Sequence, residues 1–241
     1  EMIGIDGGIG KALGKALLRP RQALPGRHDK AGDFQIEPVE QGQLETPVPI
    51  VDLDIVDANL RRWQARCDTL GLGNRPHIKT HKLAGLAQYQ IDLGAVGITV
   101  QKLGEAEVMA DAGITEMLMT FNVVGAPKLR RLAALAKRAN ISVVADNAEV
   151  VAGLGLAGRE AGRDISVLVE CETGAGRNGV ASAQAAAELA RVIDATPGVR
   201  YGGLMTYPAP KTRLDSAAIL AEARDLIAAA GLETKVISSG G

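Results

Sequence analysis

A lysine between two histidines is the first feature of the sequence that could do chemistry. His77, Lys79 and His81 alternate within RPHIKTH, over 75–81. If this run is a β-strand, the three side chains share one face, because successive side chains point to opposite sides. A lysine inside a protein tends to lose its proton, and a neutral amine can attack an aldehyde to form a Schiff base. The same residues could equally be a surface lysine beside two ordinary histidines.

The two histidines alone could also suggest a metal. A His-x-x-x-His zinc site is disfavoured here, because on a strand Lys79 would lie between the two ligands and repel the ion.

A glycine-rich stretch is the second such feature. ECETGAGRNGV (170–180) carries three glycines around Arg177. Glycine lets the backbone approach a ligand closely, and an arginine can donate to an oxygen or ring nitrogen of a planar cofactor. The alternative is a surface turn with a solvated arginine.

The terminal ISSGG is the third feature. A small-residue loop after the last strand of a barrel often holds a phosphate through backbone N–H groups. Ser-Ser-Gly-Gly is also typical of a flexible tail, so this motif has two interpretations.

These motifs fall within a repeated strand-then-helix order. Strands are expected over 48–54, 75–81, 96–101, 116–122, 141–146, 165–171, 200–207 and 235–241. Helices are expected after each of the first seven, with Val56, Leu60, Trp63, Cys67 and Leu70 as the apolar stripe of the first and the others over 83–93, 103–113, 126–139, 147–161, 182–195 and 214–230. Eight repeats favour an α/β fold with a (β/α)8 TIM-type barrel over an open, doubly wound sheet. The eighth helix is missing, so we expect the chain to be truncated there.

Polar residues follow the apolar runs at the expected carboxyl ends of the strands. In such barrels this is where the active site gathers. The set beyond the lysine motif is Gln101, Asn122, Asp146, Glu170, Tyr207 and Ser238 to Gly241. Gln101, Asn122 and Tyr207 could each be a satisfied polar residue at a strand end.

Composition narrows the class of protein. The formal charge of −1 gives no reason to expect nucleic acid or a membrane as partner. Cys67 and Cys171 lie far apart and form no CxxC pair, which argues against a disulfide framework and favours the cytoplasm. Residues 1–45 have no apolar core typical of a signal peptide and are expected to form a loosely ordered arm, with the barrel over 46–241.

Four motifs in the same order resemble the D-threonine aldolase and D-serine dehydratase-like family. RPHIKTHK (75–82) is similar to the family's lysine motif, and TPVPIVDLDIVDANLRRW (46–63) to its first strand and helix. GITVQKLGEAEVMADAGITEMLMTFNVVG (97–125) resembles the segment with its Gln-Lys-x-x-Glu-Ala-Glu and Asn-x-Val-Val-Gly patterns. VECETGAGRNGV (169–180) resembles its glycine-arginine motif, with Glu172 in place of the usual Asp.

The resemblance implies a fold-type III pyridoxal 5'-phosphate enzyme with an alanine racemase-type barrel, followed in relatives by a C-terminal β-domain. Lys79 would be the Schiff-base lysine, with His81 as a second catalytic residue. The residues expected to contact the cofactor are Lys79, His77, Gln101, Asn122, Arg177, Tyr207, Ser239, Gly240 and Gly241. A divalent metal would be held by residues of the C-terminal domain, beyond Gly241, so no metal ligand is expected in this chain.

The activity implied is cleavage of small D-β-hydroxy-α-amino acids to glycine and an aldehyde. A D-serine or 3-hydroxy-D-aspartate dehydratase and an amino-acid racemase are alternatives, because LMTYPAP (204–210) departs from the Tyr-His-Gly of aldolases. A non-catalytic pyridoxal-phosphate-binding barrel is an alternative from another class. The resemblance also suggests a homodimer, and we expect the chain alone to be a weak enzyme.

Overall fold

The computed structural model describes residue 47, residues 51–208 and residues 213–240. These residues fall into two compact units, residues 51–74 with 92–95, and residues 75–91 with 96–240. The predicted arm over 1–45 lies outside the described residues. None of the helices in the described part of the chain is long and apolar enough to cross a membrane.

The first unit is built around helix α2 (Leu53–Thr69). The Asp52 carboxylate begins it by accepting the backbone N–H groups of Asp54 and Ile55 at 3.0 and 3.1 Å. This cap explains why the strand predicted over 48–54 is wrong where it can be checked: Leu53 and Asp54 are helical. Residues 48–50 lie outside the described residues.

The apolar stripe predicted for this helix is buried only in part. Cys67 is buried, but Trp63 and Leu70 are exposed. Gln64 is also buried, and its amide donates to Asp68 and accepts from Asn74, at 2.8 and 2.9 Å. A polar network therefore replaces part of the apolar contact that the sequence predicts.

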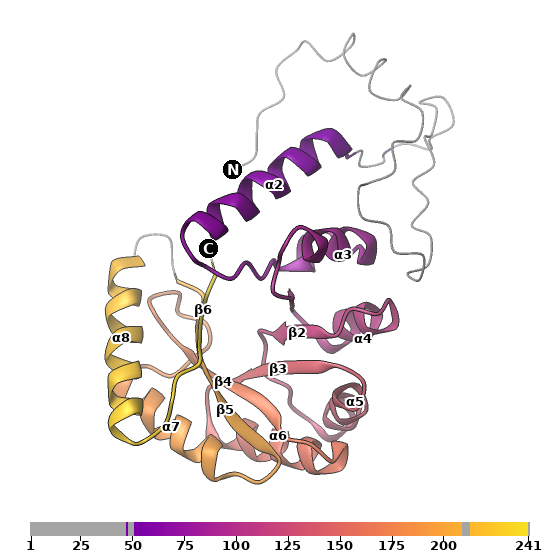
Figure 1. The fold of residues 1–241 in the computed structure, drawn as a ribbon. Coiled ribbons are helices and arrows are strands. Elements are labelled where there is room, and N and C mark those ends of the chain that lie inside the picture. The colour runs from indigo at the N-terminus through magenta and orange to yellow at the C-terminus, as the bar shows by residue number, and fades with distance from the viewer. Residues whose placement is uncertain (1–46, 48–50, 209–212, 241) are drawn as a thin grey trace. The chain divides into compact units, whose positions relative to one another are not determined.

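The second unit contains a six-stranded parallel sheet (Figure 1). Its strands are β1 (Ile98–Val100), β2 (Glu116–Met119), β3 (Asn140–Ala145), β4 (Ile165–Cys171), β5 (Val199–Thr206) and β6 (Val236–Ser239). They lie side by side in sequence order, and each neighbouring pair is parallel. A doubly wound sheet reverses its strand order, whereas these six strands keep one order from β1 to β6. The α/β class and six of the eight predicted strands are confirmed.

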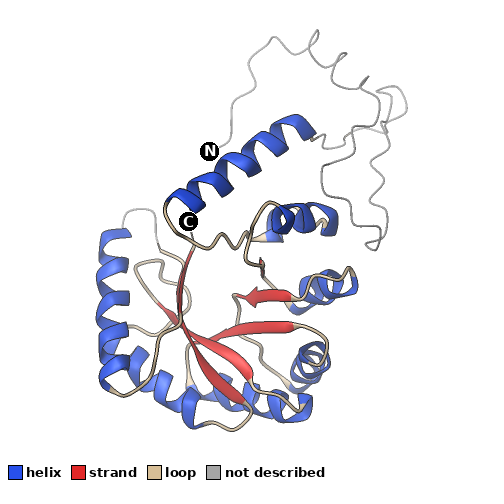
Figure 2. Ribbon diagram, viewed as in Figure 1, coloured by secondary structure: helices blue, strands red, loops and turns tan. Residues whose placement is uncertain are grey.

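Helices connect the strands and lie outside the curved sheet (Figure 2). They are α3 (Ala84–Asp92), α4 (Leu103–Asp111), α5 (Ala126–Ala136), α6 (Ala148–Ala161), α7 (Ala183–Ala195) and α8 (Arg213–Ala229). Polar side chains cap the N-termini of α6 and α7: Asn147 accepts from Val150 N at 2.9 Å, and Ser182 accepts from Ala185 N at 3.1 Å.

The sheet divides the buried side chains into two groups. Val143, Val167 and Leu204 belong to the large core that includes the helices' apolar faces. Leu118, Val144, Leu168 and Met205 form a separate cluster from β2, β3, β4 and β5. Because side chains alternate along a strand, this second cluster marks the inner face of the sheet.

Two glycines allow helix α6 to pack closely against the turn before β5. A Cβ atom on Gly158 would lie 1.7 Å from the Gly198 carbonyl oxygen. Arg159 donates to the Pro197 carbonyl oxygen at 2.7 Å and so stabilises the contact between helix α6 and the turn before β5. Side chains at positions 158 and 198 would force the helix away from the sheet.

Candidate active site

The lysine motif forms a turn where a strand was predicted. Only His77 pairs with the sheet, through a parallel bridge to Thr99, and Ile78–Thr80 is the 3-10 helix η2. His77 Nδ1 accepts the Lys79 backbone N–H at 3.3 Å, so the motif's own side chain turns the backbone away from the ladder. The prediction of a strand over 75–81 is therefore wrong beyond His77.

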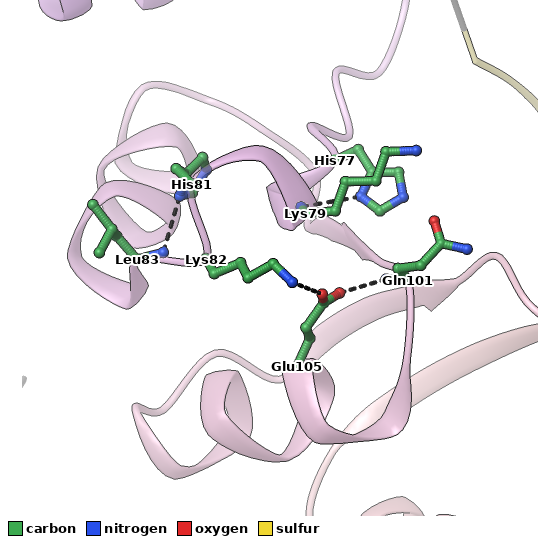
Figure 3. Close-up of polar contacts among 7 residues, drawn as sticks. All are labelled: His77, Lys79, His81, Lys82, Leu83, Gln101 and Glu105. Carbon is green, nitrogen blue, oxygen red and sulfur yellow. Dashed lines mark hydrogen bonds and ion pairs between the residues drawn. The ribbon is translucent and has the colours of Figure 1, made fainter. Parts of the chain in front are cut away.

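The expected single face of His77, Lys79 and His81 is lost with that strand. Figure 3 shows Lys79, His77 and Gln101 on one side of the turn and His81 on the other. His81 Nδ1 accepts the Leu83 backbone N–H at 3.1 Å. Lys79 is exposed, which agrees with the alternative of a surface lysine and not with a lysine inside the protein.

Both histidines are half-buried, and burial lowers the pKa of each. For His77 the Lys79 ammonium lowers the pKa further, while Gln101, Glu105 and Thr99 oppose the change. For His81 the opposing group is Gln90. Both imidazoles thus favour the neutral form, and His77 Nε2 lies 3.5 Å from Thr120 Oγ1 at the end of β2.

Three residues named from the sequence meet at the Tyr207 ring. The Lys79 Nζ atom lies 5.9 Å from the ring centroid and the Arg177 guanidinium carbon 5.2 Å. Both distances are within the range of cation–π attraction. Lys79 comes from the turn before β1, Arg177 from the loop after β4, and Tyr207 follows β5. Only the fold brings these three residues together.

The glycine-rich stretch is a closed loop on the end of β4. Val180 N donates to the Glu170 carbonyl oxygen at 2.8 Å, and Glu172 N donates to the Val180 carbonyl oxygen at 3.0 Å. Gly179 has a φ of +114°, and a Cβ there would lie 2.4 Å from Glu172 N. Glycine is therefore required at 179 by both backbone conformation and space.

Glu172 holds the inside of this loop. Its carboxylate accepts the backbone N–H groups of Gly174, of Ala175 at 2.5 Å and of Arg177 at 2.8 Å. Burial opposes ionisation, but these N–H groups and that of Gly176 lower its pKa overall. The Glu172 side chain thus serves as an anchor for the Arg177 backbone.

The loop after β6 lies beside Tyr207. Gly240 N donates to the Thr206 carbonyl oxygen at 3.0 Å, and a Cβ on Gly240 would meet the Tyr207 ring at 2.9 Å. The Ser239 hydroxyl is exposed and donates to the Gly240 carbonyl oxygen at 3.4 Å. Gly241 lies outside the described residues.

Asp146 and Glu170 complete the inner face, although we noted them in the sequence without assigning a role. Asp146 accepts from the Asn122 amide at 2.8 Å and from Gly179 N at 3.3 Å. Glu170 is 5% exposed, and its Oε2 atom has no hydrogen-bond partner among the described residues. Burial, Asp146 and Glu172 raise the pKa of Glu170 to about 7, although Arg177 opposes the shift. In the sequence, Asp146 and Glu170 could be recognised because each is a carboxylate at or next to the end of an apolar run.

A small hollow at the ends of β4 and β5 is lined by Glu170, Arg177 and Tyr207, among other residues. With Lys79 over the same ring, it gathers an amine, a guanidinium, a carboxyl group and an aromatic ring. A family model, alanine racemase N-terminal domain, matches residues 51–241. The chain belongs to this family.

Relatives within the alanine racemase N-terminal domain family agree with the resemblance found in the sequence. The chain is 33% identical over 216 residues to the 3-hydroxy-D-aspartate aldolase of Paracoccus denitrificans, which covers 84% of this chain and 56% of that protein. A crystal structure of D-threonine aldolase from Filomicrobium marinum has a TM-score of 0.77 and 36% identity, over 82% of this chain and 56% of that one.

The D-threo-3-hydroxyaspartate dehydratase from Delftia sp. is similar as well, with a TM-score of 0.70 and 33% identity over 82% of this chain and 55% of that one. The chain thus spans about half the length of the relatives that it matches. The alanine racemase N-terminal fold is confirmed. Within the described ranges, no group of three or more His, Cys, Asp or Glu residues is arranged to hold a metal.

Proposed function

We propose that the chain is the cofactor-binding part of a pyridoxal-phosphate-dependent lyase that cleaves D-β-hydroxy-α-amino acids to glycine and an aldehyde. The observation that carries this proposal is the placement of the Lys79 amine and the Arg177 guanidinium over one Tyr207 ring. The names of the relatives, aldolases and a dehydratase of D-configured hydroxy amino acids, support the substrate class.

The residues present fit pyridoxal phosphate. Lys79 offers an exposed primary amine, the group that can hold an aldehyde covalently. The Glu170 Oε2 atom is buried and lacks a hydrogen-bond partner in the described chain, which is typical of a site completed by a ligand. Glycine at 240 leaves no side chain between the terminal loop and the Tyr207 ring. When bound, the cofactor withdraws electrons from the bonds at the substrate Cα.

Each residue then has a distinct task. Lys79 would hold the cofactor, and once displaced its amine could take or return a proton at Cα. Arg177 would donate to the cofactor ring, and Glu172 fixes the loop that carries it. Backbone groups from Ser239 to Gly241 would bind the phosphate.

The remaining assigned residues would surround the substrate. His77, Gln101 and Asn122 would line the cofactor or the amino acid. His81 stays the predicted second catalytic residue, and its Nε2 atom has no hydrogen-bond partner among the residues described. Burial keeps both imidazoles in the neutral form that can accept a proton.

The wider organisation is part of the same proposal. The sequential order of the six described strands supports a (β/α)8-type barrel within 46–241, preceded by an arm over 1–45. A divalent metal bound outside this chain's residues, a homodimer and a cytoplasmic location remain predictions. Cys67 and Cys171 are both free and buried, which agrees with a reducing compartment.

Borohydride reduction of the chain mixed with pyridoxal phosphate tests the assignment of Lys79. We expect the cofactor to be fixed to the peptide that contains Lys79, and Lys79→Ala to lose it, while Lys137→Ala on the exposed end of α5 keeps it. Attachment elsewhere in the wild-type chain would contradict the proposed function.

The reaction is tested with D- and L-threonine. An aldehyde from the D-enantiomer alone would confirm an aldolase, and ammonia would indicate the dehydratase alternative. Interconversion of the enantiomers would indicate a racemase. Cofactor bound at Lys79 with no turnover would favour the non-catalytic binding barrel.

A further inference from the structure

A buried carboxylate joins the lysine turn to the end of β1. Glu105 stands in the first turn of α4, and its side chain is 6% exposed. One carboxylate oxygen lies 2.9 Å from Lys82 Nζ, and the other accepts the Gln101 backbone N–H at 2.8 Å (Figure 3). Both oxygens of Glu105 are thus used, and each binds a segment that borders the candidate site.

Lys82 has a backbone conformation that lysine seldom adopts. Its φ is +56°, in the left-handed region, where a side chain is unfavourable and glycine is the usual residue. Its backbone N–H donates to the Ile78 carbonyl oxygen at 2.7 Å and so ends the turn that carries Lys79. A lysine in this conformation at a turn end points to a task for its side chain elsewhere.

The contact with Glu105 supplies that task. Burial opposes ionisation of Glu105, but Lys82 and the Gln101 N–H lower its pKa overall, so the carboxylate is charged at neutral pH. A charge-assisted pair with a buried partner is stronger than one between exposed side chains. The turn is therefore tied to α4 at Lys82, three residues after Lys79.

We propose that Glu105 and Lys82 are positioning residues, which together hold the Lys79 amine over Tyr207. This inference rests on the proposed function of Lys79 as the cofactor lysine. Neither residue touches the Tyr207 ring; they act through the backbone of residues 78–82 and of Gln101.

Three variants separate positioning from stability. Glu105→Gln and Lys82→Met each remove the ion pair. Lys82→Gly removes it too and also relieves the strained backbone, so it separates the loss of the ion pair from the strain at position 82. Glu107→Gln is the matched control, because Glu107 lies on the same helix and pairs instead with Arg131 of α5.

Two measurements are made on each full chain. The first is the rate at which Lys79 binds pyridoxal phosphate covalently, which is trapped by borohydride and measured on the peptide that contains Lys79. Acetylation of Lys79 by acetic anhydride is the control, because this small reagent reacts with an accessible amine wherever it points. The second is hydrogen–deuterium exchange of residues 77–83. We expect capture to slow about tenfold in Glu105→Gln, Lys82→Met and Lys82→Gly, which corresponds to 1.4 kcal/mol. Exchange should rise, while acetylation of Lys79 and the Glu107→Gln control stay unchanged.

The outcomes are distinguishable. If Lys82→Gly captures the cofactor and exchanges at the wild-type rates, the proposed role of the Lys82–Glu105 pair is overturned. The pair would then not be needed to hold the turn. If the wild-type chain itself captures no cofactor at Lys79, the proposed function fails. The positioning role of Glu105 and Lys82 is then tested by hydrogen–deuterium exchange alone. Faster exchange of residues 77–83 in the variants supports this role, and unchanged exchange refutes it.

Discussion

Glu170 is the residue whose environment departs furthest from that of an ordinary carboxylate in the described site. It lies on the inner face of β4, two residues after Leu168, with Asp146 and Glu172 as like charges nearby. With a pKa of about 7 it carries a proton over part of the neutral range. A buried carboxyl group of this kind can donate a hydrogen bond as well as accept one.

The raised pKa of Glu170 predicts a pH-dependent free energy of unfolding. The native chain binds this proton more tightly than the unfolded chain, so the stabilisation is complete below about pH 4.5 and is lost as the pH rises through about 7. The wild type should lose this stabilisation as the pH is raised from 5 to 8, whereas Glu170→Gln has no such proton to lose. Over this pH range the free energy of unfolding of Glu170→Gln should therefore rise by about 2 kcal/mol relative to that of the wild type.

Urea unfolding at both pH values measures this difference. Glu160→Gln, at an exposed position of α6, is the control and should show no such gain. If Glu170→Gln and the wild type change in parallel between pH 5 and 8, Glu170 is ionised in the native chain like a surface residue.

Cys171, next to Glu170, should be inert. Burial and then the Glu170 charge raise the pKa of its thiol to about 12, and the residue is 3% exposed. Only the thiolate reacts readily, so iodoacetamide at pH 8 should leave Cys171 unmodified in the native chain and alkylate it in urea. Mass spectrometry of the peptide gives the result; rapid native alkylation would show that the end of β4 opens.

At the residue level, the sequence predicted the chemistry better than the geometry. Lys79, Arg177 and Tyr207 were named from motifs and do meet in space. Alternation of His77, Lys79 and His81 gave the wrong face, because a side chain that binds its own backbone makes a turn from the same residues. No periodicity in a sequence distinguishes those two outcomes.

At the scale of the elements, helix α6 has little room for a side chain at Gly158. Gly158→Ala would place a methyl group against the Gly198 carbonyl group, and we expect a loss of about 3 kcal/mol in the free energy of unfolding. Gly153→Ala in the same helix meets only the flexible end of Leu129 at 3.2 Å and should lie within about 1 kcal/mol of the wild type. Thermal unfolding compares the two; equal losses would mean that the helix shifts freely.

The six strands and their helices were predictable because each has a clear apolar pattern. The β4 prediction of 165–171 matches the observed strand at both ends, since all seven residues are buried. The run over 48–54 is also rich in apolar residues, yet Asp52 caps a helix that begins at Leu53. Local hydrogen bonds of single polar side chains decide such boundaries, and hydropathy does not record them.

On the scale of the whole molecule, the strand order gives the site its parts. Lys79 precedes β1, Arg177 follows β4, Tyr207 follows β5 and Gly240 follows β6. Residues spread over more than half of the chain reach one end of the sheet because every strand runs the same way. In a barrel-type fold, loops at this end can change while the sheet stays as it is.

The same order has a consequence for how the protein is made. Among the described strands, pairing occurs only between neighbours in sequence order, so none of them must wait for a partner that is inserted later between two others. During translation, which proceeds at about 5–20 residues per second, each new strand leaves the ribosome with one neighbour already available. The sheet can therefore grow in the direction of synthesis, and Tyr207 joins Lys79 and Arg177 only after β5 has docked.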